Sequence, residues 1–398
     1  MQMALYHPRW GYYSRRDALG ESGDFYTSPE LHPLFAAAVV TRTYSVWQGL
    51  GSPNPFDFVE VGGGSGRFAR DFLLYVDECF PELSRALHYR IDDRGANLRK
   101  IQLERLIRAK LDRRVRWTDG SPSVWTKGSV RGMIVANELI DALSVHLVTA
   151  RDGELQELYV REQGSTLALE PGPPSTPDLE RYLRAIDVDV PDGVQWEINL
   201  NAPRWIQRTS RALERGALLL MDYGYPASDL YSASRSKGSL LCYAQHTVHS
   251  DPLRDPGAND ITCHVDFTTL RLSLASANMT IVEDSSQAEA LGGPSFSDWR
   301  DWTLAGESPW RHRIGLARSL DALCDPDGLG RLQWIMSVKG LQEVTPLVKP
   351  LVPAPRLTSL IQDHLLLPDP ATLDPIVGIE KQWQELWQED DEDPDFPR

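Results

Sequence analysis

The residues of this chain most suited to chemistry are three glycines at alternating positions. The apolar run Phe56–Val61 leads into Gly62, Gly64 and Gly66, and the amphipathic run Arg67–Val76 follows at once. This pattern predicts a strand, a tight turn and a helix. Because glycine has no Cβ, the backbone of such a turn can approach a ligand closely, and the first N–H groups of the helix point towards it. We therefore expect a ligand site at this turn, with a glycine turn that binds nothing as the alternative.

The spacing of these glycines favours one cofactor over another. Glu60 lies two residues before Gly62, which gives the pattern E-x-G-x-G-x-G, whereas the dinucleotide pattern G-x-G-x-x-G would need a glycine where Arg67 stands. S-adenosylmethionine (SAM) has no pyrophosphate to hold, and a carboxylate near the strand end can face its sulfonium and amino charges. The pattern thus favours SAM, and it argues against the alternative of an NAD-dependent oxidoreductase.

A second acidic signal follows the next predicted strand, Leu87–Asp92. Asp93 comes directly after it, one β-α-β unit past the glycine turn. A carboxylate at this place can accept hydrogen bonds from both ribose hydroxyls. NAD enzymes and methyltransferases share the feature, so Asp93 supports the fold more than the chemistry, and a solvated turn acid is the alternative.

Composition and charge argue against several classes of protein. The 398 residues carry a net charge of −15, which argues against a general nucleic-acid binder because such proteins present basic surfaces. No apolar run approaches the roughly 20 residues that span a membrane, and the first residues do not resemble a signal or transit peptide. The four cysteines form no C-x-x-C pair. We therefore expect reduced thiols, no bound metal and a cytoplasmic protein.

Predicted strands and helices alternate along most of the chain. Strands separated by helices predict a parallel, doubly wound sheet that binds ligands at the carboxyl ends of its strands. Residues 1–30, rich in Tyr, Gly and charge, are expected to form a loop that covers a site, and Pro29–Trp47 to form a helix with Ser28 as its N-cap. The predicted parts are an N-terminal covering loop and helix (1–50), a core (51–144 and 196–340), an inserted subdomain with a hairpin (145–195), and a Pro-rich, acidic tail (341–398).

Four further segments, in order around the glycine turn, sharpen this interpretation. They are Gly11–Tyr13 with Gly20–Glu30 (G-E-S-G-D-F-Y-T-S-P-E), Ala136–His146 (A-N-E-L-I-D-A-L-S-V-H), Asp222–Gly224, and Asp260–Phe267. With the glycine motif they resemble the MidA family of SAM-dependent methyltransferases. That family includes a mitochondrial arginine methyltransferase needed for assembly of respiratory complex I. The resemblance covers about residues 4–270, and more weakly extends to about residue 339.

The resemblance implies a class I methyltransferase fold. This is an α/β, Rossmann-like architecture with a doubly wound, mostly parallel seven-stranded sheet and an inserted subdomain. It also implies SAM as the cofactor, with its methionine part at the glycine turn, its ribose at Asp93, its adenine near Asp119, and the N-terminal loop closing over it. The implied cofactor-binding residues are Glu60, Gly62, Gly64, Gly66, Asp93, Asp119, Gly23, Asp24, Phe25 and Ser28.

The resemblance also implies protein arginine methylation of the symmetric dimethylation type. A guanidinium stays protonated and is a poor nucleophile, so such an enzyme needs carboxylates that hold it and localise its charge. Glu138 and Asp141 follow an inner strand and are the best candidates, and the Asn137 amide can orient the target; capping of the following helix is the alternative role. His264 and Asp266 are expected to orient the substrate.

The expected partner is a protein substrate, with no nucleic acid and no membrane. A role in complex assembly and a homodimer are further expectations. A small-molecule methyltransferase on the same fold and a SAM-binding assembly factor without turnover remain open as alternatives.

Overall fold

A large sheet forms the centre of the molecule. The computed structural model describes residues 1–14, 27–120, 125–164, 166–244, 247–306 and 309–341. Seven strands run in the order β15-β16-β9-β4-β1-β2-β3. Strands β3, β2, β1, β4 and β9 are parallel, and β16 is antiparallel to both of its neighbours. The strands are β1 (Phe56–Val61), β2 (Leu87–Asp92), β3 (Val115–Thr118), β4 (Val130–Asn137), β9 (Leu213–Asp222), β15 (Thr280–Ser286) and β16 (Gln333–Lys339). The predicted doubly wound, mostly parallel seven-stranded sheet is confirmed.

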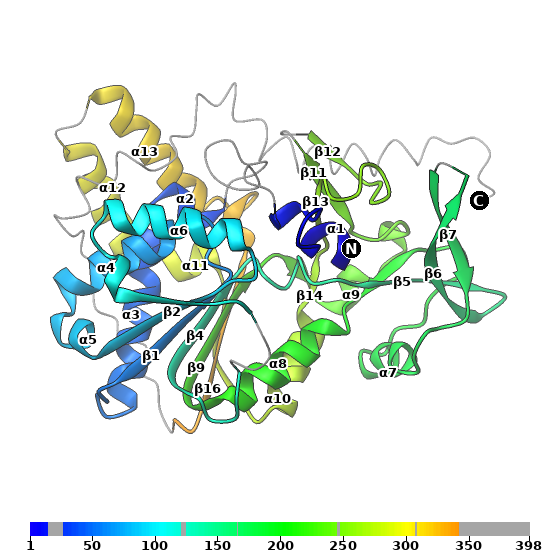
Figure 1. Cartoon of the computed structure of the whole chain (residues 1–398), viewed down its shortest axis with the longest axis horizontal. Helices are drawn as coiled ribbons and strands as arrows, with labels where there is room; N and C mark the ends of the chain where they lie inside the picture. The colour runs from blue at the N-terminus through cyan, green and yellow to red at the C-terminus, as the bar shows by residue number, and fades with distance from the viewer. Residues whose placement is uncertain (15–26, 121–124, 165, 245–246, 307–308, 342–398) are drawn as a thin grey trace.

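Helices cover both faces of this sheet (Figure 1). One apolar cluster packs the larger helical layer against the sheet, and a second cluster packs α8 and α10 against the other face. The first layer consists of α3 (Leu34–Gly49), α4 (Arg67–Cys79), α5 (Pro81–Ala86), α6 (Ala96–Arg108), α11 (Gln287–Leu291), α12 (Pro294–Ala305) and α13 (Trp310–Leu323). The second consists of α8 (Asn201–Ala212) and α10 (Phe267–Ser276).

A second, smaller sheet is inserted after β4. Its strand order is β7-β6-β5-β8, and its β6–β7 hairpin lies at the opposite end of the molecule from α12 and α13 (Figure 1). Asp152 and Gly153 both have positive φ at the β5–β6 turn, as the predicted hairpin requires. The sheet ends at Ile198, beyond the predicted limit of 195, because β8 pairs with β5. The elements are β5 (His146–Arg151), β6 (Glu154–Gln163), β7 (Thr166–Gly172), α7 (Asp178–Ala185) and β8 (Trp196–Ile198).

Further short elements lie between the insertion and the core. A three-stranded sheet has the order β12-β11-β13, and β10 pairs with β14. Leu5 and Tyr12 pack against Cys242 and Ile261, so the start of the chain lies against the three-stranded sheet. The short elements are β10 (Gly224–Tyr225), α9 (Ala227–Leu230), β11 (Leu241–Ala244), β12 (Thr247–His249), β13 (Asp260–Thr262) and β14 (Val265–Asp266).

The N-terminal region differs from its prediction in three ways. The expected loop contains a helix, α1 (Gln2–Tyr6), and a 3₁₀ turn at Tyr12–Ser14. The expected helix over Pro29–Trp47 is broken into α2 (Ser28–Leu31) and α3, because Pro33 disfavours helical backbone in the residue before it and His32 is extended. Ser28 is not the N-cap; Thr27 occupies that position, and the Ser28 hydroxyl donates to Gln287 Oε1 at 3.0 Å.

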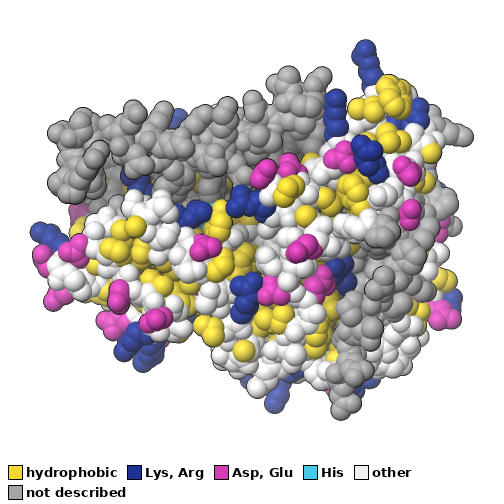
Figure 2. Space-filling model, turned by 180° about the vertical axis from the view of Figure 1, so that it is seen from behind, with side chains coloured by type: hydrophobic (Ala, Val, Ile, Leu, Met, Phe, Trp, Pro, Cys, Tyr) yellow, Lys and Arg dark blue, Asp and Glu magenta, His cyan; other side chains and the backbone are white. Residues whose placement is uncertain are grey.

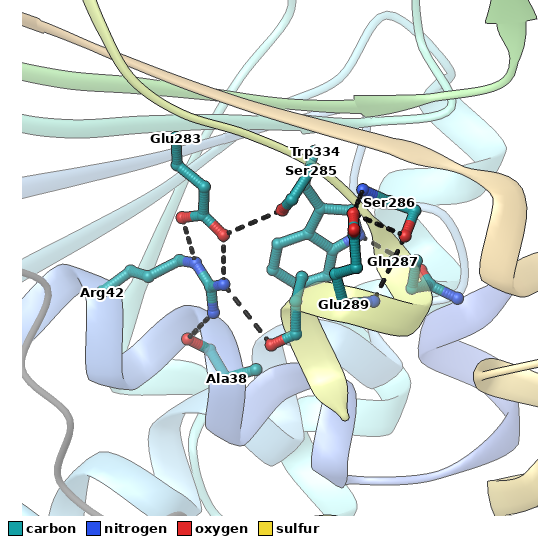
Figure 3. A network of polar contacts seen from close by, with 9 residues as sticks. Ala38, Arg42, Glu283, Ser285, Ser286, Gln287, Glu289 and Trp334 are labelled. Carbon is teal, nitrogen blue, oxygen red and sulfur yellow. Dashed lines mark hydrogen bonds and ion pairs between the residues drawn. The ribbon is translucent and has the colours of Figure 1, made fainter. Parts of the chain in front are cut away.

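An ion pair fixes α3 to the edge of the sheet. The Arg42 guanidinium donates to both carboxylate oxygens of Glu283 on β15 and to the carbonyl of Ala38 (Figure 3). It also lies 4.7 Å from the ring centroid of Trp334 on β16, a cation–π distance. Because α2 precedes α3 directly, this anchor also holds the segment that borders the site described next.

Candidate active site

A cavity of about 440 Å³ lies at the carboxyl ends of the central strands. Its walls come from the glycine turn after β1, the ends of β2 and β4, the loop that follows β4, α2 and α8. The N-terminal residues Tyr6 and Tyr13 line it from another side. This is the edge where a doubly wound sheet binds its ligands, so the site lies where the sequence predicted it.

The three predicted glycines divide into two roles. All three have positive φ, of 75° at Gly62, 49° at Gly64 and 79° at Gly66, a region that favours glycine. Gly62 and Gly64 line the cavity, and a Cβ built on Gly64 would meet no protein atom within 4 Å. Gly66 does not line it; it starts α4, and a Cβ there would lie 2.9 Å from Gln102 Cα on α6. Gly64 therefore leaves space for a ligand, a Cβ on Gly62 would lie 3.5 Å from Leu139 Cδ1, and Gly66 allows two helices to pack.

Glu60 lies on β1, two residues before Gly62, and lines the cavity. Its side chain is buried, and Oε2 accepts a hydrogen bond of 2.7 Å from the Tyr89 hydroxyl. Burial raises the pKa of Glu60 to about 8, against the smaller opposing effect of this hydrogen bond. A cationic ligand group nearby would favour the ionised form, so the residue suits the sulfonium or amino group of a cofactor such as SAM.

Asp93 lines the cavity at the end of β2 and is held by three donors. Oδ2 accepts from Gly63 N at 3.1 Å and from Gln102 Nε2 at 2.7 Å, and Oδ1 accepts from Gly95 N at 2.8 Å. Each carboxylate oxygen has two lone pairs, so Oδ2 is fully used and Oδ1 retains capacity for a ribose hydroxyl. Burial nevertheless raises the pKa of Asp93. Gln102 also donates to Gly64 O at 3.1 Å, so it links the glycine turn to the predicted ribose acid.

Sequence reasoning missed Gln102, because a glutamine inside a helix carries no motif of its own. It also assigned the adenine to Asp119, which does not line the cavity. The neighbouring Gly120 does, and its N–H donates to Asp92 Oδ1 at 3.0 Å. Asp92 Oδ2 accepts from Trp125 Nε1 at 2.8 Å, so this buried acid fixes the loop after β3.

The segment after β4 brings the predicted catalytic residues into the cavity. Asn137, Glu138 and Asp141 all line it. Glu138 has φ of 45°, a left-handed conformation uncommon outside glycine, and Asn137 Nδ2 donates to its Oε1 at 3.1 Å. Burial, and then the negative charge of Asp141, raise the pKa of Glu138 to about 8.

Asp222 and Tyr223, at the end of β9, hold that segment in place. Asp222 Oδ2 accepts from the backbone N–H groups of Ile140 at 2.9 Å and Asp141 at 3.3 Å. The Tyr223 hydroxyl donates to Asp141 Oδ2 at 2.7 Å. Burial, and then the charges of Asp141 and Glu138, raise the pKa of Asp222 well above its usual range. Both residues belong to the Asp222–Gly224 segment that carried the family resemblance. Their positioning role is not evident from that segment alone, because it depends on contacts between the end of β9 and the loop after β4.

Asp141 and Asn137 each keep one side-chain oxygen for a ligand. Asp141 Oδ1 and Asn137 Oδ1 are buried and have no hydrogen-bond partner. Burial raises the pKa of Asp141 to about 6, opposed by the Tyr223 hydrogen bond. An unsatisfied buried acceptor is unfavourable, so two such atoms on one cavity wall indicate that a donor-rich group binds there.

The N-terminal tyrosines cover this acidic wall. The Tyr6 hydroxyl donates to Ala142 O at 3.0 Å, and the Tyr13 hydroxyl donates to Asp260 Oδ1 at 2.8 Å. Their rings stack with centroids 5.4 Å apart. The prediction that an aromatic N-terminal region covers the site therefore agrees with the positions of these two residues.

The rest of the predicted covering segment is only partly described. Gly23, Asp24 and Phe25 lie outside the described residues, and Ser28 does not line the cavity. Glu30 does line it. Its carboxylate accepts from the Ser65 hydroxyl and, at 2.7 Å, from the buried Arg67 Nε, and so joins α2 to the glycine turn.

His264 and Asp266 lie outside the cavity. Asp266 is the N-cap of α10, where Oδ1 accepts from Thr268 N at 2.9 Å and Thr269 N at 3.2 Å, and the Tyr182 hydroxyl donates to Oδ2 at 2.8 Å. His264 packs against the rings of Tyr223 and Tyr225. The structure thus gives Asp266 a capping role rather than contact with a substrate in this cavity.

The side chains and helices of the described ranges bear on metal and membrane binding. The His, Cys, Asp and Glu side chains of these ranges form no group of three that could hold a metal ion. Among the same residues, no helix is both long and apolar enough to cross a bilayer.

The fold and the cavity together define a class I methyltransferase architecture, and comparison with known proteins gives the family. Residues 38–283, more than half of the chain, match the family model described as "Putative S-adenosyl-L-methionine-dependent methyltransferase". The chain belongs to this family.

Solved and curated relatives agree with that assignment. The chain is similar to the crystal structure of a COG1565 superfamily member from Burkholderia thailandensis bound to S-adenosyl-homocysteine, with a TM-score of 0.75 and 27% identity over 88% of this chain and 89% of that one. It is 30% identical over 294 residues to the Drosophila melanogaster homolog of the mitochondrial protein arginine methyltransferase NDUFAF7, and 29% identical over 295 residues to the Homo sapiens protein. These alignments cover 68% of this chain but only 64% and 63% of the two relatives.

The relatives also correct one prediction. The curated relatives, NDUFAF7 and its Drosophila homolog, are named as mitochondrial proteins, so they point to a mitochondrial rather than a cytoplasmic location, and the cytoplasmic prediction is wrong. That prediction depended on general features of composition and of the first residues, which do not identify a compartment on their own.

Proposed function

We propose that this protein transfers a methyl group from SAM to an arginine side chain of a protein. The observation that carries the proposal is that one cavity holds both a glycine turn with space for a ligand and an acidic wall on which Asp141 Oδ1 and Asn137 Oδ1 have no partner. The names of the curated relatives support protein arginine as the acceptor.

The residues of the cavity fit SAM by their chemistry. The space in front of Gly64 admits a ligand, Glu60 would hold the amino and sulfonium charges, and Asp93 would hold a ribose hydroxyl. When bound, SAM supplies a carbon that is already activated by its sulfonium. The protein therefore has to orient the acceptor nitrogen in line with that carbon and to keep water out.

Glu138 and Asp141 would bind and polarise the acceptor guanidinium. A planar guanidinium presents several N–H donors, which match two neighbouring carboxylates and the Asn137 amide oxygen. The acceptor nitrogen loses a proton as it gains the methyl group, and Asp141 Oδ1, which has no partner, would receive that proton. Symmetric dimethylation would require the singly methylated guanidinium to return with its other terminal nitrogen at the same place.

The decisive test uses methyl-labelled SAM and the purified protein with a lysate of cells that lack it. Label in a protein band that yields dimethylarginine on hydrolysis, lost in Glu138→Gln, supports the proposal. Label found only in a small-molecule extract would instead assign a metabolite methyltransferase. Binding of SAM without any labelled product would assign a SAM-binding assembly factor.

A further inference from the structure

The cavity has a basic wall as well as an acidic one. Arg94, Arg204 and Arg208 all line it. Arg94 follows Asp93 directly, whereas Arg204 and Arg208 are four residues apart on α8 and therefore lie on the same face of that helix. Over the molecular face shown in Figure 2, acidic and basic side chains are interspersed. The grouping of three arginines around one cavity contrasts with that mixed surface.

Two of these arginines have no anionic partner within the described part of the chain. Arg204 Nη2 lies 3.3 Å from Asp178 Oδ2 in an exposed ion pair. Arg208 Nε, by contrast, is buried and has no hydrogen-bond partner, and no ion pair joins Arg94 or Arg208 to a described carboxylate. Asp92 attracts Arg208, but no hydrogen bond or ion pair joins these two described side chains, and the Asp92 oxygens accept from Thr118 Oγ1, Gly120 N and Trp125 Nε1 instead.

The two unpaired arginines repel each other. Burial, and then the charge of Arg94, lower the pKa of Arg208, and Asp92 offsets this only in part. A partly buried guanidinium beside another cation is unfavourable unless an anion binds both. Arginine binds carboxylates with paired N–H donors, so the pair is suited to one carboxylate that the described protein does not itself supply.

Tyr6 joins this basic wall to the acidic one. The Arg94 guanidinium lies 5.9 Å from the centroid of the Tyr6 ring, and the Tyr6 hydroxyl binds Ala142 O, next to Asp141. One tyrosine side chain therefore spans the distance between Arg94 on the basic wall and the backbone next to Asp141 on the acidic wall. An extended peptide rises about 3.3 Å per residue, so a single short segment can reach both.

We propose that Arg94 and Arg208 bind an aspartate or glutamate of the substrate protein, within about four residues of the arginine that is methylated. This inference depends on the proposed function. The other available carboxylate is that of SAM itself. It belongs to the methionine part, which the proposed binding mode puts at the glycine turn and Glu60, whereas Arg94 adjoins the ribose acid Asp93.

The test compares short peptides that contain one arginine and one variable residue at each neighbouring position. With the wild-type protein, a glutamate should raise kcat/KM for methylation about tenfold over a glutamine, equivalent to about 1.4 kcal/mol, because only the glutamate accepts charge-assisted hydrogen bonds from the arginines. Arg208→Glu should reverse this preference in favour of a lysine at the same position. Arg211→Glu is the matched control, since Arg211 is exposed on the same helix and does not line the cavity.

Each result has a defined meaning. Methylation that is indifferent to the acidic residue would overturn this inference and leave the proposed function intact. Loss of SAM affinity in Arg208→Glu, measured by calorimetry, without a change in peptide preference would assign the arginine pair to the cofactor carboxylate. Methylation of no peptide and no lysate protein, with SAM bound, would overturn the proposed function and this inference with it. If Arg208→Glu unfolds, Arg94→Glu takes its place in the same comparison.

Discussion

The two sides of the cavity differ in how completely their polar atoms are satisfied. On the cofactor side, Asp93 accepts from three donors of the protein, and Gln102 connects it to the glycine turn. On the acceptor side, Asp141 Oδ1 and Asn137 Oδ1 are buried without partners, and the charge of Asp141 adds to burial in raising the pKa values of Glu138 and Asp222. The cofactor side is thus preformed, whereas the acceptor side remains incomplete until a cation binds.

This difference teaches where binding energy can be used for catalysis. A preformed side binds its ligand uniformly, before and during the reaction. On the acceptor side, Asp141 Oδ1 and Asn137 Oδ1 have no partner, so a bound cation stabilises this wall most. In the proposed function this contact orients the acceptor during methyl transfer. Substitutions on the two sides should therefore affect different measured quantities.

The largest effect is expected on the acceptor side, from Glu138→Gln. The change keeps the shape of the side chain and removes the charge, so kcat should fall about 100-fold or more, as happens when one preorganised electrostatic contact is removed. The affinity for SAM should change little. Single-turnover methylation with labelled SAM measures the first quantity and isothermal calorimetry the second.

The control for that prediction is Glu162→Gln, which removes the same charge from an exposed position on β6. It should leave both quantities unchanged. A Glu138→Gln protein that keeps wild-type kcat would show that Glu138 does not act on the acceptor.

The second effect is expected on the cofactor side, from Asp93→Asn. Loss of a charged hydrogen bond from the ribose to Asp93 Oδ1, about 1.5–3 kcal/mol, should weaken SAM binding about 10- to 100-fold. At saturating SAM, kcat should stay within a few-fold of wild type. The dissociation constant from calorimetry decides the matter, and an unchanged constant together with a lowered kcat would reverse the assignment of the two sides.

The third effect is expected on the pH dependence of activity. It separates a residue that positions Asp141 from the residues that contact the acceptor. Asp141 and Glu138 must be ionised to hold a guanidinium, and burial raises their pKa values to about 6 and about 8. Both groups lose their proton as pH rises, so kcat/KM should increase through this range and level off above about pH 9. The Tyr223 hydrogen bond lowers the pKa of Asp141.

Tyr223→Phe removes that hydrogen bond and should move the lower limb of the profile up by about one unit, equivalent to about 1.4 kcal/mol. Activity should then fall about tenfold well below pH 6 but only about twofold at pH 7, where Asp141 would be half protonated in the variant, and it should match the wild type near pH 9. A fall that is equal at every pH would instead mean that Tyr223 supports only the fold. The pH profile of kcat/KM for both proteins, with Tyr225→Phe as the matched control, distinguishes the two results.

The sequence predicts the cofactor side far better than the acceptor side, for a physical reason. The strand Phe56–Val61 and its glycine turn are set by local pattern and by backbone conformations that only glycine adopts readily, and the strand bounds agree with the structure. The support of Asp141 by Asp222 and Tyr223 joins residues about eighty positions apart, in the loop after β4 and at the end of β9. Such contacts have no local signal.

Other differences between prediction and structure have separate causes. β15, with the sequence T-I-V-E-D-S-S, has no clear alternation of apolar and polar residues. It is an edge strand of the sheet, and its pairing with β16 contains a bulge. The break at Pro33 could have been found locally, since proline disfavours helix in the residue before it. The sequence predicts Asp119 at the adenine because Asp119 follows β3. In the structure the next residue, Gly120, lines the cavity instead.

The smallest effect is therefore expected from Asp119→Ala, and it tests that last point. Gly120, and not Asp119, lines the cavity, and the acid that fixes this loop is Asp92, through Gly120 N and Trp125 Nε1. Substitutions away from a binding site usually change free energies by no more than about 0.5 kcal/mol, so the affinity for SAM should change by no more than about twofold. Calorimetry beside Asp93→Asn gives the comparison. A loss as large as that of Asp93→Asn would mean that the loop after β3 turns Asp119 into the cavity when the cofactor binds, and that the cofactor side is less preformed than its hydrogen bonds indicate.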